Sequence, residues 1–159
     1  MERIIFNMKN SLKLTAVILF SIFTVNSAPS QNAMEVKPIE LVNNPAVYLN
    51  KDVKMSAQFD KFSTLGLDYK KAFRDSKDYI SVLIKRPDVN KEYTIPLSEL
   101  KLILKREAAE KLLDIESGDR VQIVGKVFST ALNDPWVDVT ELKNLDPDKK
   151  KDLDEDTDL

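Results

Sequence analysis

The chain has 159 residues and contains neither cysteine nor histidine, and its 24 Lys and Arg residues nearly balance 26 Asp and Glu residues. These absences exclude disulfide bonds, a lipid anchor on cysteine, histidine-ligated zinc, and catalysis by a serine–histidine or cysteine–histidine pair. Residues 34–145 carry 18 basic and 18 acidic side chains, so this neutral part lacks the positive charge typical of a general nucleic-acid binder.

An apolar segment, LTAVILFSIFTV at residues 14–25, follows Lys9 and Lys13 and precedes three small or polar residues. This order is typical of a secretory signal peptide, and the segment is shorter than the roughly 20 residues that span a bilayer. We therefore expect residues 1–28 to be a signal peptide, starting at Met1 or Met8. The mature protein is then periplasmic or secreted, without an integral membrane span. Residues 29–37 are predicted to be a flexible leader of the mature chain.

The first elements of the predicted domain, residues 38–145, are a short helical turn and a loop broken at Pro45, and then a strand. The strand is indicated by alternating apolar residues that run to about Phe62: Val53, Met55, Ala57 and Phe59. A long charged loop follows at residues 65–77. A second strand is indicated at residues 79–84, and a brief third strand at residues 93–95.

The remaining elements are a helix and two strands. Residues 98–113 are predicted to be helical, with Ser98 as N-cap and a stripe formed by Leu100, Leu104, Ala108 and Leu112. Alternating apolar residues predict a fourth strand at residues 121–127, and a fifth includes Val137 and Val139. Gly125 lies within the fourth strand, where a glycine indicates a bulge or bend.

Three strands, a helix and two strands in this order predict a mostly β fold, the five-stranded Greek-key barrel called the OB-fold, with one helix between strands three and four. Three segments carry a resemblance to exported bacterial OB-fold proteins. They are N-P-x-x-Y-x-x-K-x-V from Asn44, G-D-x-V-x-I-x-G-x-V from Gly118, and P-W-V-x-V from Pro135. The resemblance implies a barrel that binds nucleic acid, oligosaccharide or protein.

Two motifs resemble chemical sites, and both are better explained by structure. Ser98 and Lys101 match S-x-x-K, but the S-D-N and K-T-G elements of serine acyl-transferases are missing. Alternate aspartates from Asp152 resemble a calcium loop, but Thr157 stands where the required glycine should be. Residues 146–159 are instead predicted to be an acidic disordered tail. We therefore expect no catalytic residue, no metal ligand and no cofactor.

Aromatic and basic side chains near the first long loop are the candidate ligand-binding residues, because aromatics can stack on bases or sugars while cations meet phosphate. In an OB-fold this loop borders the binding groove. Trp136 and Tyr79 alternate away from core residues, so each is expected to lie on the outer side of the barrel. Packing of the loop and rim is the alternative interpretation. The candidates are Tyr69, Lys71, Phe73, Arg74, Tyr79 and Trp136.

Together these features favour a non-enzymatic binding module of the cell envelope or extracellular space that recognises a protein, peptide or glycan. Binding of single-stranded nucleic acid is the alternative, suggested by the fold and by cations such as Lys70, Lys85 and Arg86. The neutral body and the acidic tail count against it, and an enzyme that uses carboxylates or lysine is the least favoured interpretation.

Overall fold

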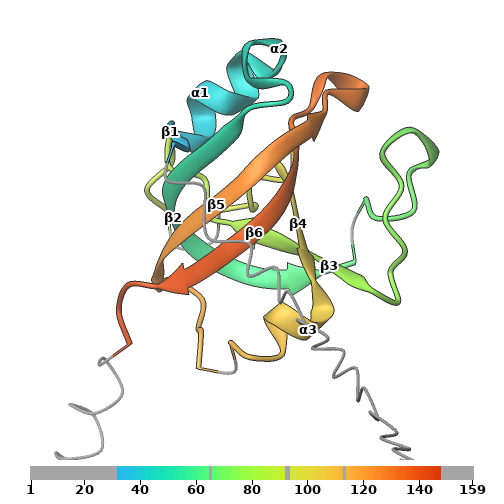
Figure 1. Ribbon diagram of the computed structural model, residues 1–159. Helices are drawn as coiled ribbons and strands as arrows, with labels where there is room; N and C mark the ends of the chain where they lie inside the picture. Colours follow the sequence, from blue (N-terminus) through green and yellow to red (C-terminus); the bar gives the residue numbers. More distant parts are fainter. Residues whose placement is uncertain (1–31, 65, 92–93, 113, 148–159) are drawn as a thin grey trace, which may run out of the picture.

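The computed structural model describes residues 32–64, 66–91, 94–112 and 114–147 (Figure 1). The predicted signal peptide and residues 148–159 of the predicted acidic tail lie outside these ranges. Among the described residues, no helix has the length and apolar character needed to span a membrane.

Five strands form a closed barrel: β2 (Asp52–Ser63), β3 (Tyr79–Ile84), β4 (Lys101–Lys105), β5 (Arg120–Ser129) and β6 (Trp136–Asn144). Their order around the barrel is β2-β3-β4-β6-β5, and β2 pairs with β5 to close it. The β4–β6 pair is parallel, and the other four pairs are antiparallel. The mostly β barrel predicted from the sequence is confirmed, and its strand arrangement is compatible with an OB-fold.

The barrel closes because β2 is long and bends. Its first half, from Asp52 to Gln58, pairs with β5, and the part from Phe59 onward pairs with β3, with a shift in register between Phe59 and Lys61. A second shift lies between Val124 and Gly125, where β5 pairs with β6. A Cβ atom on Gly125 would collide with the backbone oxygen of Asp138, so this position requires glycine. The bend predicted at this glycine is confirmed.

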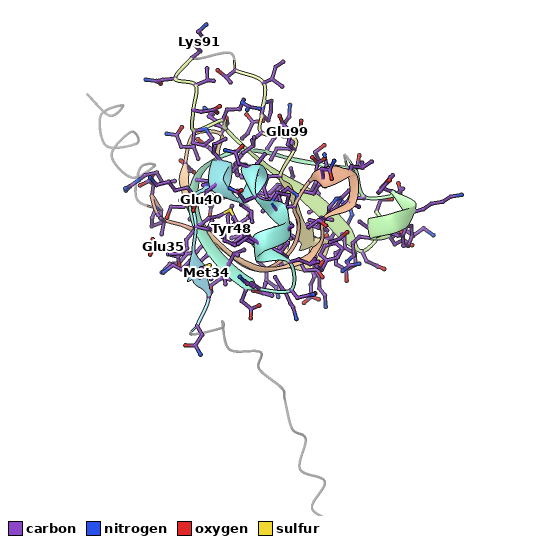
Figure 2. All side chains as sticks on the ribbon, turned by 90° about the horizontal axis from the view of Figure 1, so that it is seen from above. Met34, Glu35, Glu40, Tyr48, Lys91 and Glu99 are labelled. Atoms are coloured by element: carbon purple, nitrogen blue, oxygen red, sulfur yellow. The ribbon has the colours of Figure 1, made fainter. Side chains whose placement is uncertain are left out.

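Short helices cover the two ends of the barrel (Figure 1). At one end lie α1 (Pro38–Asn43) and α2 (Pro45–Tyr48); a helical turn and a loop broken at Pro45 were expected here, and Pro45 begins the second helix. Figure 2 looks onto this end, with Tyr48 above the barrel, where its hydroxyl donates to Glu40 Oε1 at 3.3 Å. The opposite end is covered by α3 (Arg106–Ala109), whose alanines pack against the core.

The fold includes residues before position 38. Strand β1 (Met34–Glu35) pairs in parallel with the start of β2, and Val36 is buried, with its backbone N–H donating to Lys54 O at 2.9 Å. The segment predicted to be a flexible leader, residues 29–37, therefore includes part of the fold. All buried hydrophobic residues of the described chain lie between Val36 and Leu142, so a chain starting at residue 32 contains the complete set.

The helix predicted for residues 98–113 is wrong over its first half, where residues 101–105 form strand β4. The stripe itself does contact the barrel core, but Leu100 reaches it from a bend just before β4, Leu104 from β4 and Ala108 from α3. Leu102 also faces this core, whereas Ile103 faces a second cluster outside it. Because both faces of β4 are buried, its sequence lacks the alternation that marks a half-buried strand.

The third strand predicted at residues 93–95 is also wrong where it can be judged. Tyr93 lies outside the described residues, and Thr94 and Ile95 belong to no strand. Strand β4 is instead the third strand of the barrel. A long loop joins it to β3, and the strand predicted at residues 93–95 falls within that loop.

Candidate functional site

The β2–β3 loop (residues 64–78) folds onto the outer side of the barrel. A second hydrophobic cluster, separate from the barrel core, fills the contact; its buried members are Leu67, Ala72, Ile103 and Trp136. The loop has its own backbone hydrogen bonds, from Arg74 N to Leu67 O at 2.9 Å and from Ala72 N to Tyr69 O at 3.0 Å. A short 3₁₀ turn, η1 (Lys70–Ala72), lies between them. The loop that was expected to border a binding groove is thus packed against β4 and β6.

Trp136 lies at the centre of this second cluster. It points away from the barrel core, as the alternation with Val137 predicted, but its exposed fraction is 0% because the loop covers it. The Tyr69 ring stacks on it, with ring centroids 5.7 Å apart and planes inclined by 20°. Its indole Nε1–H donates to Ala131 O at 2.8 Å. In this structure Trp136 packs the loop onto the barrel, and no face of it is open for stacking on a ligand.

Arg74 holds the same loop to β6. Its Nε donates to Asp138 Oδ1 at 3.0 Å and its Nη2 donates to Asp138 Oδ2 at 2.6 Å. The guanidinium lies over the Phe128 ring, 4.0 Å from the centroid, and 5.8 Å from the centroid of Tyr79. The hydrogen bond to Asp138 raises the pKa of Arg74, while partial burial opposes that effect. The positive charge of Arg74 is therefore balanced by the carboxylate of Asp138.

The structure brings four of the six candidate residues together: Tyr69, Arg74, Tyr79 and Trp136. Their described contacts are with one another and with the barrel, as the packing interpretation predicts. Phe73 differs, because 53% of its surface is exposed. The side chain of Lys71 lies outside the described part of the chain.

A groove lies elsewhere on the barrel, between the outer side of β2 and the β3–β4 loop (residues 85–100). Its main hollow has a volume of about 590 Å³. A second hollow of about 360 Å³ shares five residues with it, so the two are continuous. We call the two hollows together the basic groove; residues that line them include Gln58, Lys85, Arg86, Val89, Asn90 and Arg120.

Backbone pairing fixes both sides of the basic groove. Gln58 stands opposite Arg120 in the β2–β5 pair, and Lys85 N donates to Gln58 O at 2.8 Å. The β3–β4 loop then continues outward, and Figure 2 shows Lys91 far from the barrel axis on this loop. The groove therefore has a floor of regular strand and one wall made by a projecting loop.

Among the described residues that line the main hollow, three are cations, Lys85, Arg86 and Arg120, and none is acidic. Two of these cations form ion pairs with acids that do not line the main hollow. Arg86 pairs with Asp88 and Glu99, at 3.4 and 3.0 Å, and Arg120 pairs with Asp146 at 2.7 Å. These hydrogen bonds raise the pKa values of both arginines. Among the described residues, Lys85 has no ion-pair partner within 4.0 Å.

The second hollow differs at its far end. Lys91 lines it, and so does Asp60, whose Oδ2 is buried without a hydrogen-bond partner among the described residues. A donor from a ligand would satisfy this oxygen, whereas an acid would be repelled by it. The groove therefore favours negative charge near Lys85 and a hydrogen-bond donor near Asp60.

Sequence reasoning noted Lys85 and Arg86 only as scattered cations. Their position in the loop that forms one wall of the groove could have been predicted, because the two cations follow the second predicted strand and precede Pro87. Nothing local places Arg120 or Leu145 beside them, since that proximity depends on closure of the barrel.

The described residues offer no group of three acidic side chains that could hold a metal ion. At the S-x-x-K motif, Lys101 is the first residue of β4, and its Nζ donates to the backbone oxygen of Ser98. The same Nζ lies 3.5 Å from Asp134 Oδ2. Its described contacts are thus with a carbonyl and a carboxylate, as in a structural role.

No family model matches the sequence, and no curated protein matches it. Solved structures do resemble the fold, among them one described as an aspartyl-tRNA synthetase from Leishmania major Friedlin. That similarity has a TM-score of 0.45 and 10% sequence identity, and it covers 76% of this chain. The chain spans 22% of the length of that protein.

Proposed function

We propose that the chain is a non-enzymatic binding module that recognises an acidic, extended segment of a protein through the basic groove. The observation that carries the proposal is the composition of the main hollow. Three cations stand beside the aliphatic surfaces of Val89, Pro87 and Leu145, over a floor of regular strand. An extended peptide with alternating acidic and aliphatic side chains is complementary to that lining.

The kinds of side chain that line the groove in the described part of the chain support this proposal over the alternatives. Among the described residues that line the two hollows, none is aromatic. Proteins that bind single-stranded nucleic acid combine cations with aromatic platforms for the bases, and sugars are commonly held by aromatic faces in the same way. The aromatic residues Tyr69 and Trp136 are instead stacked on each other beneath the β2–β3 loop. A peptide ligand therefore suits the groove better than an oligonucleotide or a glycan.

Calorimetric titration tests the proposal with a peptide of alternating Glu and Leu, the same peptide with Gln for Glu, and a single-stranded oligothymidine. We expect the acidic peptide to bind, and Lys85→Glu to weaken its binding about tenfold, which corresponds to about 1.4 kcal/mol. Lys126→Glu is the matched control, because Lys126 is exposed on β5 and does not line the groove. Equal binding of both peptides, equal loss in both variants, or preference for the oligonucleotide would overturn the proposal.

We further propose that the module acts outside the cytoplasm, on a partner in the cell envelope or extracellular space. The basis is the predicted signal peptide at residues 1–28. N-terminal sequencing of the protein expressed in a bacterium should find a start between residues 28 and 34. An intact Met1 or Met8 in the cytoplasmic fraction would contradict export.

A further inference from the structure

The chain leaves the barrel at the basic groove. Leu145, which follows β6, lines the main hollow, and its backbone N–H donates to Arg120 O at 2.8 Å. The next residue, Asp146, accepts hydrogen bonds from Arg120 N at 3.0 Å and from Arg120 Nη2 at 2.7 Å. Its side chain is only 8% exposed. Asp146 therefore belongs to the barrel, although the sequence placed it at the start of the tail, and the rest of the chain starts beside the groove.

The sequence that follows has the chemistry that the basic groove favours. Residues 152–159, DLDEDTDL, contain five acidic side chains, no basic side chain and two leucines. Residues 149–151 are three lysines, which the groove cations would repel, so they would lie outside the groove. Acidic and aliphatic side chains thus occur together only beyond residue 151.

The spacing allows this segment to reach the cations. Asp152 lies five steps along the chain from Pro147, and an extended chain covers about 3.3–3.6 Å per step, which gives roughly 17 Å of reach. Attachment to the same chain supplies an effective concentration in the millimolar range for short flexible connections, so weak intrinsic affinity is sufficient for occupancy.

We propose that residues 152–159 of this same chain occupy the basic groove and compete with its external ligand. The proposal rests on the proposed function, because it assigns the acidic-peptide site to an internal segment. The acidic side chains contact Lys85, which has no ion-pair partner among the described residues, and the leucines contact the aliphatic surface near Val89. The external partner must displace this segment, so the binding module is self-inhibited.

The absence of cysteine permits a direct test on the chain from residue 32 to 159. Thr157→Cys introduces a single thiol for a nitroxide spin label, and NMR records which backbone amides lose intensity. We expect losses at Gln58, Lys85 and Asn90, and none at Val47 on α2. The losses should disappear in about 1 M salt, where the Debye length is about 3 Å. Uniform or absent losses would overturn the proposal.

Neutralising the tail gives the second measurement, with Asp154→Asn, Glu155→Gln and Asp156→Asn combined in one variant. We expect this variant to bind the Glu-Leu peptide at least about fivefold more tightly than the parent chain, because no internal competitor remains. Unchanged affinity would overturn the self-inhibition while leaving peptide binding by the groove intact. If neither chain binds the peptide but the spin label still broadens the groove amides, the tail contact stands and the proposed external ligand is wrong.

Discussion

Arg74 and Asp138, which are 64 positions apart in the sequence, are joined by two hydrogen bonds of 3.0 and 2.6 Å. The pair connects the β2–β3 loop to β6, and the guanidinium is also in contact with the Phe128 ring. The side chains of the two residues are 26% and 37% exposed, so solvent screens the pair only in part. This ion pair is therefore a principal attachment of the loop to the barrel.

Replacing Arg74 by alanine should loosen the loop and lower the free energy of unfolding by about 1–2 kcal/mol, because a partly buried carboxylate loses its donors. Urea unfolding followed by circular dichroism measures the change. Lys111→Ala is the control, since Lys111 and Glu107 form an ion pair with side chains 73% and 82% exposed, and it should cost less than about 0.5 kcal/mol. Equal effects in the two variants would contradict the attachment.

Truncation of Trp136 should lower the stability of the protein far more than truncation of Phe73. Trp136→Ala removes a fully buried side chain and should cost about 3–5 kcal/mol of stability. Phe73→Ala removes a side chain that is 53% exposed and should change stability by about 0.5 kcal/mol or less. Thermal melts of the two variants test this difference. A large loss in Phe73→Ala would mean that its ring packs more closely than its exposure indicates.

Gly125→Val should destabilise the protein by at least about 1–3 kcal/mol, because an added side chain meets β6 at once. Its Cβ would lie 2.8 Å from Val137 Cγ1 and closer still to the backbone oxygen of Asp138. Adding Val137→Ala removes only the first of these contacts. We expect the double variant to stay as unstable as the single one in urea, and recovery of the parent stability would contradict the backbone clash.

Glu99 should contribute to the acid sensitivity of the fold. Its own backbone N–H, followed by the guanidinium of Arg86, lowers its pKa from the ordinary 4.5, and partial desolvation opposes this. The unfolded chain then binds the proton more tightly, so the stabilisation is present above about pH 4.5 and is lost as the pH falls through the lower, folded pKa. An NMR titration should place the Glu99 midpoint below 4.5. Arg86→Gln should raise the midpoint only in part, because the backbone donor remains.

The sequence predicts the strands that are buried on one face only, and it misses β4, which is buried on both faces. In β2, the buried residues Val53, Met55 and Phe59 alternate with more exposed positions, so period two is visible. In β4, Leu102, Ile103 and Leu104 are all buried, because the barrel core covers one face and the second cluster covers the other. A continuous apolar run of this kind is compatible with a helix until the tertiary structure is known.

The candidate site was predictable only in its local part. The phase of Trp136 relative to Val137 correctly indicated that the indole lies outside the barrel core. The residue that pairs with Arg74 lies far away along the chain, and no local pattern identifies Asp138 as its partner. The basic groove is a tertiary feature in the same sense, because pairing of β2 with β5 brings Arg120 next to Gln58.

The burial of Trp136 gives the protein an intrinsic optical reporter. It is the only tryptophan in the chain, and the β2–β3 loop excludes water from it completely. Its fluorescence emission should therefore shift to longer wavelength whenever that loop detaches, even while the barrel remains folded. A ligand in the basic groove, which Trp136 does not line, should leave the emission unchanged. The emission of the unlabelled protein thus reports movement of the loop alone and is silent to occupation of the groove.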